Sequence, residues 1–304
     1  MPKQSEFLGI TDIIGLDEDL PVHRHHDVYP TIDPSAAFAQ KTFAGQVVLV
    51  SGASRGIGRE AARFYARAGA ATALVARTES ALQETRALIL DEMPDAQVLV
   101  LTADVKDHVA VAKAVEATVA RFGRLDILIA NAGTTSAFNP LITEKDPDEW
   151  WDTVEVNVRG VFNLVRAGLP HLKGGHGRVV ITTSSGAQIR LPGSSDYNLS
   201  KHTLLRLTEL IALEFPDVRV FAMHPGAVKT EIVKKAAFGP EVYEAIFQDS
   251  VQLGPATMLY LTAGKADYLS GRYMSANWDL AEVERDWKDK IVSEHGLVSK
   301  LYIP

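Results

Sequence analysis

From residue 46 onward, short apolar runs alternate with longer stretches in which apolar residues recur at helical spacing. The short runs are rich in β-branched residues, which predicts buried strands, and the longer amphipathic stretches predict helices. We expect strands over 46–50, 71–76, 98–102, 125–130, 178–183 and 218–222. We expect helices over 58–68, 79–92, 107–122, 149–169 and 196–215.

This alternation is typical of βαβ units, whose strands are parallel and are covered by helices on both faces. The chain is therefore predicted to be an α/β protein with a single Rossmann-type, doubly wound parallel sheet and ligand sites at the carboxyl ends of the strands. A last strand over 271–274 and a terminal helix over 281–294 extend the pattern. We expect an extended N-terminal arm (1–44), one α/β catalytic domain (45–278) and a C-terminal helix and tail (279–304).

The N-terminal arm is rich in proline and acidic residues and has no long periodic pattern. Its contacts with the core are expected through its apolar residues, namely Leu8, Ile10, Ile13, Ile14 and Leu16. A cluster of three histidines, His23, His25 and His26, suggests a metal site. No nearby spacing completes a structural metal site, so we prefer to interpret the segment as a polar arm.

Composition narrows the classes of function. The chain has 31 Lys and Arg against 38 Asp and Glu, a net charge of −7, which argues against a nucleic-acid binder. With no cysteine, disulfides, Cys-ligated metals and thiol nucleophiles are excluded. No apolar run is long enough for a membrane span, and the N-terminus lacks the features of a signal peptide, so a cytoplasmic enzyme is expected.

A glycine-rich loop joins the first predicted strand to the first helix, with the sequence Ser51-Gly52-Ala53-Ser54-Arg55-Gly56-Ile57-Gly58. Glycines permit a tight turn and let backbone N–H groups approach a pyrophosphate, and the helix N-terminus adds a partial positive charge. The alternative is a glycine-rich turn without a ligand. We expect the loop to bind a dinucleotide through Gly52, Ser54, Arg55, Gly56, Ile57 and Gly58.

Tyr197 and Lys201 are four residues apart on a predicted helix, so both can reach one ligand. A nearby ammonium favours the phenolate, which makes Tyr197 a plausible general acid/base for an alcohol–carbonyl pair. Chance spacing on a helix is the alternative. Hydroxyl groups that could polarise the substrate oxygen follow the fifth strand, at Thr182, Thr183, Ser184 and Ser185.

The residues after the second strand bear on the choice of dinucleotide. An acidic side chain there would bind the ribose 2′-hydroxyl of NAD(H), but the position is Ala76. Arg77 follows, and Arg55 lies in the glycine loop; both suit a 2′-phosphate. We therefore favour NADP(H) over NAD(H). The alternative is that Arg77 only flanks the adenine or is solvated.

The spacing of the glycine loop resembles that of the classical short-chain dehydrogenases/reductases, whose opening motif is T-G-x-x-x-G-[IL]-G. Here Ser51 stands for the threonine and keeps a hydroxyl. Further matches follow in order across residues 47–230. The resemblance implies that Asp104 and Val105 contact adenine, that Asn131-Ala132-Gly133 is the family's N-A-G motif, and that Pro225, Gly226, Val228 and Thr230 close over the nicotinamide amide.

The same resemblance implies a catalytic set of Asn157, Ser185, Tyr197 and Lys201, with Lys201 also holding the nicotinamide ribose. Asn157 is implied to hold a bulge and an ordered water that links Lys201 to solvent. Ser185 is the second serine of the family's Ser-Ser pair, whereas the family's usual interval of thirteen residues before the tyrosine selects Ser184. We prefer Ser185, because a loop loses a residue more easily than a strand shifts its pleat.

The implied function is NADP(H)-dependent interconversion of a carbonyl and an alcohol on a small substrate. Apolar and aromatic residues are expected to face that substrate, namely Phe138, Ile189, Leu191, Pro192, Val228, Ile232, Phe238, Tyr243 and Phe247. Two alternatives stay open: a non-redox member that retains the cofactor, such as a dehydratase or cyclase, and an NADP-sensing binding protein. Family members commonly form homodimers or homotetramers through the helices that carry Asn157 and Tyr197.

The segment S-G-R-Y-M-S-A-N-W-D, over 270–279, resembles a branch frequent in filamentous fungi, often in secondary metabolism. Within it, Trp278 either lines the pocket or anchors the C-terminal tail, and we favour the anchor.

Overall fold

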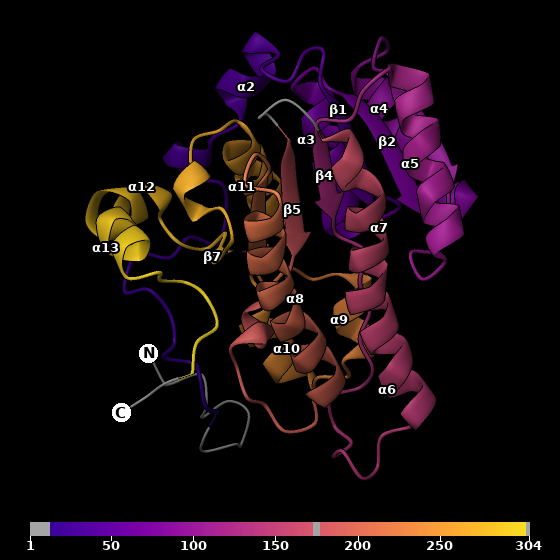
Figure 1. Ribbon diagram of the computed structural model, residues 1–304. Coiled ribbons are helices and arrows are strands. Elements are labelled where there is room, and N and C mark those ends of the chain that lie inside the picture. The colour runs from indigo at the N-terminus through magenta and orange to yellow at the C-terminus, as the bar shows by residue number, and fades with distance from the viewer. Residues whose placement is uncertain (1–12, 173–176, 302–304) are drawn as a thin grey trace.

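A parallel sheet of seven strands forms the centre of the computed structural model, which describes residues 13–172 and 177–301. Its order is β3-β2-β1-β4-β5-β6-β7, so the strand order reverses between β1 and β4 (Figure 1). The strands are β1 (Val47–Ser51), β2 (Ala71–Ala76), β3 (Val98–Thr102), β4 (Ile127–Ala130), β5 (Arg178–Thr182), β6 (Arg219–His224) and β7 (Arg272–Ser275). All neighbouring strands are parallel, which places their carboxyl ends at one edge.

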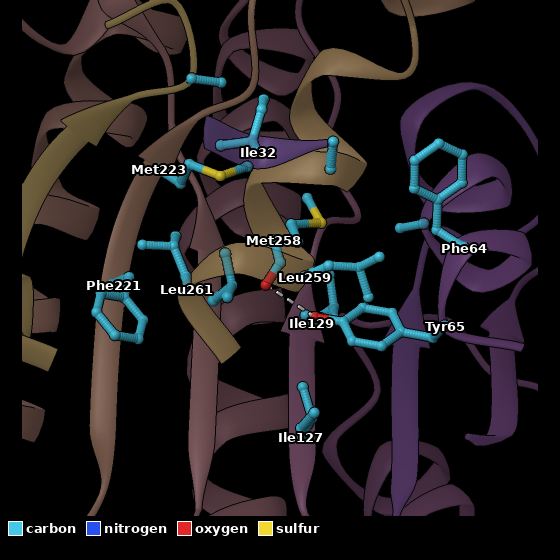
Figure 2. Close-up of a cluster of buried hydrophobic side chains, with 14 of the residues drawn as sticks. Ile32, Phe64, Tyr65, Ile127, Ile129, Phe221, Met223, Met258, Leu259 and Leu261 are labelled. Atoms are coloured by element: carbon cyan, nitrogen blue, oxygen red, sulfur yellow. Dashed lines mark hydrogen bonds between the residues drawn. The ribbon is translucent and has the colours of Figure 1, made fainter. Parts of the chain in front are cut away.

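Helices cover both faces of the sheet, and the side chains of each strand alternate between the two. Val48 and Val50 of β1 pack with α3 (Gly56–Arg67), α4 (Glu79–Glu92) and α11 (Leu253–Thr262). In Figure 2, Tyr65 of this cluster points toward Met258, whose carbonyl accepts a hydrogen bond from its hydroxyl at 3.2 Å.

Val47 and Leu49 pack on the opposite face with α5 (His108–Phe122), α7 (Gly160–Gly168) and α8 (Ser195–Glu214). Burial on both faces explains why the strands are uniformly apolar. The predicted doubly wound fold is confirmed, and each of the seven predicted strands is present with ends shifted by at most a few residues.

The helix predicted over 149–169 is one continuous helical segment with a change of pitch in its middle. It consists of α6 (Pro147–Val154), the π-helical turn η2 (Glu155–Arg159) and α7. The terminal helix predicted over 281–294 is similarly divided into α12 (Leu280–Glu282), the π-helical turn η6 (Val283–Trp287) and α13 (Lys288–Ser293). Neither π turn is visible in a pattern of apolar residues, because both preserve the buried face.

Three helices between β6 and β7 were not predicted: α9 (Glu231–Lys235), α10 (Pro240–Ile246) and α11. The first two are too short to show a period. Almost every residue of α11 is buried, so this helix has no polar face to reveal it. None of the helices in the two described stretches is both long and apolar enough to cross a bilayer.

The prediction of an extended arm over 1–44 is wrong in part. The segment contains the 3₁₀ turn η1 (Pro30–Ile32) and α2 (Ser35–Gln40), and Tyr29, Ile32 and Phe43 lie in the main core. Of the apolar residues expected to make its contacts, Ile14 is 59% exposed, Ile13 and Leu16 are partly buried, and Leu8 and Ile10 lie outside the described residues.

Trp278, at the end of β7, is 1% exposed and acts as an anchor, as predicted, but for the N-terminal arm. Its indole N–H donates to the Asp19 carboxylate at 2.5 Å, and its carbonyl accepts from the Tyr29 hydroxyl at 2.7 Å. The arm and the last strand are therefore joined by buried polar contacts.

Candidate active site

The loop between β1 and α3 is so tight that its three glycine positions cannot take a larger residue without strain or a close contact. Gly52 and Gly56 have φ values of 68° and 55°, which favour glycine. A Cβ on Gly58 would lie 2.3 Å from the Gly52 carbonyl oxygen. The α3 N-terminus has no side-chain cap, so its first N–H groups are available to an anionic ligand. These features fit the pyrophosphate of a dinucleotide.

Ser51, at the end of β1, fixes the start of this loop to the end of β4. Its hydroxyl oxygen accepts hydrogen bonds from the backbone N–H groups of Asn131 and Ala132, at 3.0 and 3.1 Å. The side chain of Asn131 in turn donates to the Ser51 carbonyl at 3.3 Å. A serine hydroxyl is therefore sufficient at this position, and the glycine loop and the N-A-G segment are brought together as predicted.

The predicted adenine end of the site lies at the ends of β2 and β3. Arg77 and Arg55 are both exposed, and within residues 13–172 and 177–301 the Arg77 guanidinium has no hydrogen-bonded or ion-paired partner. The Asp104 carboxylate accepts from the N–H of Lys106 at 2.9 Å, which closes a turn after β3. Val105 is buried against Gly160, and a Cβ on Gly160 would lie 2.6 Å from the Val105 side chain.

Tyr197 and Lys201 share one face of α8, as their spacing predicted, with the Lys201 ammonium 5.7 Å from the centre of the Tyr197 ring. Lys201 is 3% exposed, and its ammonium donates to the Thr182 carbonyl at 2.9 Å. The Thr183 hydroxyl donates to the Lys201 carbonyl at 2.9 Å. Two hydrogen bonds therefore fix α8 to the end of β5.

The serine beside Tyr197 is Ser184, the alternative to the expected Ser185. The Ser184 hydroxyl and the Tyr197 ring lie side by side, since a Cβ on Gly186 would be 3.3 Å from Ser184 Oγ and 3.5 Å from Tyr197 Cε1. The Ser184 hydroxyl also caps a 3₁₀ turn, η4 (Ser185–Ala187), by accepting from the Gly186 N–H at 3.0 Å. The turn begins at Ser185, so the strand-end hydroxyl that faces α8 is the one before it. No hydrogen bond links Ser185 and Tyr197 side chains in the described ranges.

Asn157 is fully buried in the π-helical turn η2. Its side-chain oxygen accepts from the Thr134 N–H at 2.8 Å, and its amide donates to the Thr134 carbonyl and the Ser200 hydroxyl, each at 2.9 Å. A Cβ at Gly133 would lie 3.2 Å from Asn157 Oδ1 and 3.4 Å from Lys201 Nζ. Asn157 therefore joins the loop after β4 to α8, next to Lys201. π-Helical turns frequently occur at functional sites.

Burial moves the acid–base properties of the two α8 groups in opposite directions. It raises the pKa of Tyr197 above the usual value, and the hydrogen bond from Ser184 opposes this in part. It lowers the pKa of Lys201 to about 8, because the ammonium has lost most of its hydration. In the chain without cofactor, burial thus has the larger effect, and the pKa of Tyr197 lies above its usual value.

Aromatic side chains extend from Tyr197 toward the segment after β6. The ring of Phe138 lies 5.7 Å from that of Tyr197 and 5.1 Å from that of Phe238. Phe247 continues the row, 5.6 Å from Phe238 and 5.4 Å from Tyr243. These four residues were among those expected to face the substrate, and the structure brings them together.

The loop after β6 reaches the glycine loop. Pro225 and Gly226 follow β6, and Val228 is 6% exposed. The methyl group of Thr230 lies 3.3 Å from where a Cβ on Gly56 would be. The segment expected to close over a nicotinamide therefore lies across the glycine loop. Two nearby lysines are ion-paired, Lys229 with Glu244 and Lys234 with Glu231.

A buried ion pair next to Tyr197 was missed by sequence reasoning. The Lys145 ammonium, 4% exposed, lies 3.0 Å from the Asp196 carboxylate, which is fully buried. The ammonium also donates to the Ser136 hydroxyl at 2.8 Å. Burial raises the pKa of Asp196, but the hydrogen bonds from Ser136 and Lys145 outweigh it, so this pKa is lower than usual. The pair fixes the loop after β4 to the first turn of α8.

The histidine cluster of the arm makes individual carboxylate contacts. A ring N–H of His25 donates to Asp279 at 2.9 Å, and a ring N–H of His26 donates to Asp249 at 2.5 Å. Over the described ranges, no three His, Asp or Glu side chains are grouped as the ligands of a metal ion would be.

Comparison with known proteins gives a family for most of the chain. The family model described as short chain dehydrogenase matches residues 46–239. "Short chain dehydrogenase mpl6" of Monascus purpureus is 43% identical over 287 residues, covering 92% of this chain and 95% of the relative. "Short chain dehydrogenase pigC" of Monascus ruber is 34% identical and covers 91% of each chain. These relatives agree with the expected similarity to fungal proteins.

Solved structures show the same fold. Levodione reductase superposes with a TM-score of 0.72 at 30% identity, covering 77% of this chain and 97% of its own. Carveol dehydrogenase from Mycobacterium avium, in complex with NAD, gives a TM-score of 0.70 at 28% identity, covering 76% and 96%.

The buried ammonium of Lys201 generates a prediction for stability. Its pKa is about 8 in the folded chain and 10.5 when exposed. Between these values only the unfolded chain holds the proton, so rising pH favours the folded state, and this gain is lost as the pH falls through 8. From pH 7.5 to pH 10, the free energy of unfolding should rise by on the order of 2 kcal/mol relative to Lys201→Met. Urea unfolding across this range measures it, and parallel pH profiles would contradict burial of a charged ammonium.

Proposed function

This chain belongs to the short-chain dehydrogenase family, and on that premise we propose that it is an NADP(H)-dependent oxidoreductase that interconverts a carbonyl and an alcohol on a small apolar or aromatic substrate. One observation carries the proposal. At the carboxyl edge of the sheet, beside a glycine loop that fits a pyrophosphate, Tyr197 lies next to Ser184, and the buried ammonium of Lys201 is 5.7 Å from the centre of its ring. A proton donor, a hydroxyl and a cation thus converge where the dinucleotide would end.

Cofactor binding is proposed along the strand ends from β3 to β6. The residues that would hold it are Gly52, Ser54, Arg55, Gly56, Ile57 and Gly58 at the pyrophosphate, Asp104 and Val105 at the adenine, Asn131, Ala132 and Gly133 along the floor, Tyr197 and Lys201 at the ribose, and Pro225, Gly226, Val228 and Thr230 at the nicotinamide. Ligands of this kind bind where the strand order of a doubly wound sheet reverses. That point lies between β1 and β4.

Preference for NADP(H) rests on two exposed arginines. Arg77 follows β2, and the residue before it is the neutral Ala76. The carboxylate that would bind the ribose 2′-hydroxyl of NAD(H) is therefore missing from this position. Arg55 stands at the cap of α3. Guanidinium groups bind phosphate through paired, charge-assisted hydrogen bonds, which an unmodified ribose cannot offer.

The residues of α8 and β5 supply the proton chemistry. When bound, the reduced nicotinamide supplies a hydride to the carbonyl carbon. The proton that completes the alcohol comes from the Tyr197 hydroxyl, which burial keeps protonated. The Ser184 hydroxyl, already directed at Tyr197, donates a hydrogen bond to the same substrate oxygen as negative charge develops on it.

After the proton leaves, the remaining phenolate needs positive charge nearby. Lys201 provides it, because its ammonium lies 5.7 Å from the centre of the Tyr197 ring. Asn157 holds the π turn against the loop after β4 and the Ser200 hydroxyl, one residue before Lys201. Its proposed role is to position Lys201 and to line a route for the proton from solvent.

The proposed substrate class follows from the row of Phe138, Phe238, Phe247 and Tyr243 beside Tyr197. Apolar walls with few polar groups bind apolar or aromatic ligands. Two lysines of the segment after β6 are ion-paired, Lys229 with Glu244 and Lys234 with Glu231, while Lys235 donates to the Thr134 hydroxyl at 3.4 Å. A neutral ketone or quinone therefore fits this side of the site better than a carboxylate or phosphate.

A homodimer or homotetramer is proposed through the outer faces of α7 and α8. Several large apolar side chains there are exposed, namely Phe162 (49%), Leu199 (50%), Leu210 (46%) and Leu213 (77%). Exposed apolar surface of this kind is typical of contacts between subunits.

Tyr197→Phe tests the assignment of the proton donor. The variant keeps the ring against Phe138 but has no proton to give, so kcat for NADPH-dependent reduction of a ketone and quinone panel should fall by at least about a thousandfold. NADPH binding, followed by nicotinamide fluorescence, should change little. Turnover close to that of the unaltered protein would remove Tyr197 from the chemistry.

The neighbouring serines provide a matched pair. Ser184→Ala should lower kcat by about 10²–10³, as expected for loss of one hydrogen-bond donor to a developing oxyanion. Ser185→Ala should stay within about threefold of the unaltered enzyme, because Ser184 is the serine that contacts Tyr197. Steady-state kinetics with NADPH in excess distinguish the two, and a larger loss in the Ser185 variant would reverse the assignment.

Arg77→Ala tests the choice of cofactor. Loss of charge-assisted hydrogen bonds to a 2′-phosphate should lower kcat/KM for NADPH about 10- to 100-fold. The value for NADH, which has no such phosphate, should change less than about twofold. Arg121→Ala, a cation on α5 outside the proposed site, is the control. Preference of the unaltered enzyme for NADH would refute the proposal.

A further inference from the structure

The N-terminal arm precedes the part of the chain that matches the family, residues 46–239, and it crosses the loop that carries Ser184. The Ile14 carbonyl accepts a hydrogen bond from the Arg190 N–H at 2.8 Å. Gly15 approaches this loop so closely that a Cβ on it would lie 2.4 Å from the Gln188 carbonyl oxygen. The Arg190 guanidinium is also ion-paired with Glu18. The arm therefore contacts the outer side of the loop after β5.

Further along, the same arm reaches the loop after β6. A ring N–H of His26 donates to Oδ1 of Asp249 at 2.5 Å, and the His26 carbonyl accepts from the Ser250 N–H at 2.8 Å. The other oxygen of Asp249 accepts from the Ala227 N–H at 2.5 Å and from the Asn277 side chain at 2.9 Å. Asp249 thus connects the arm directly to the backbone of the Pro225–Thr230 segment.

The Asp249 carboxylate is nearly buried and depends on the hydrogen bond from His26. The Asp249 side chain is 4% exposed, and a buried carboxylate is costly without donors and positive charge. Burial lowers the pKa of the neighbouring His224 to about 4, so that ring is neutral at physiological pH. Asn277 is also neutral. Within the described ranges, the side chains that donate hydrogen bonds to Asp249 are those of His26 and Asn277, and that of His26 is 63% exposed.

We propose that residues 14–29, here called the arm strap, hold the loops of the active site in place. In this proposal His26 and Asp249 are positioning residues for the loop after β6. The strap spans from the loop of Ser184 to the loop of Ala227, and so it fixes the separation of the two walls between which substrate and nicotinamide would lie. In its middle the strap pairs with the segment after β7, where Arg24 and Trp278 form an antiparallel bridge. The inference rests on the proposed function for its catalytic meaning, but its structural content can be tested separately.

Hydrogen exchange of the full-length protein without ligand is the direct test. In His26→Ala, amides of the 225–230 segment, Ala227 included, should exchange about tenfold faster, because Asp249 has lost the donor that joins it to the arm. His26→Asn should stay near the unaltered rate, since its side-chain amide donates from the place of the ring N–H. His23→Ala is the control, because the exposed His23 side chain makes no hydrogen bond in the described ranges. Asp249→Asn, which weakens the bond to Ala227, is a second variant that should also accelerate exchange.

Steady-state kinetics supply the functional readout. His26→Ala should raise the KM for NADPH about five- to tenfold and leave kcat within about threefold, and His26→Asn should restore the KM. If both His26→Ala and Asp249→Asn leave exchange of the 225–230 segment within twofold of the unaltered protein, the proposed role of the strap is overturned, whatever enzymatic activity the variants show. If exchange accelerates but the unaltered protein oxidises NADPH with no ketone or quinone, the proposed function fails while the positioning contact stands.

Discussion

The hydrogen bond from the Lys201 ammonium to the Thr182 carbonyl is the contact on which the arrangement of the site depends. It joins the catalytic helix α8 to the end of a central strand. Because the ammonium is buried and its folded-state pKa falls to about 8, the group stays there only as long as the backbone holds its acceptor, the Thr182 carbonyl, in place. With Lys201 fixed, one helical turn sets the position of Tyr197, and the end of β5 sets that of Ser184.

Two buried lysines in this region are handled differently. Lys145 has a full counter-charge in Asp196, and the pair acts as a rigid link between the loop after β4 and α8. Lys201 instead contacts the Thr182 carbonyl and lies over the Tyr197 ring. Because no carboxylate neutralises it in the described residues, its positive charge can act on the reacting groups. Asp196 of the ion pair and the proposed functional cation Lys201 thus lie five residues apart on α8. What distinguishes the two lysines is their surroundings.

Much of this could be predicted from the sequence, because the central strands are uniformly apolar and the motif residues sit at their ends. The remaining features are ones that the pattern of residues does not encode. Ser184 rather than Ser185 faces Tyr197, because a 3₁₀ turn begins one residue later than a simple strand end would suggest. α11 was missed because it is buried on almost every side. The Lys145–Asp196 pair joins positions that only the tertiary fold brings together, and no local signal marks either residue.

The contacts of the N-terminal arm also bear on how the chain reaches its folded state. The arm is synthesised well before its polar partners: His26 and Asp249 are 223 residues apart, and Asp19 and Trp278 are 259 apart. Loops of that length close late, after the contacts between neighbouring strands and helices have formed. During synthesis the arm must therefore remain without its partners until β7 emerges. Docking of the arm is accordingly a late event of folding, which must wait for the last strand of the sheet and the residues that follow it.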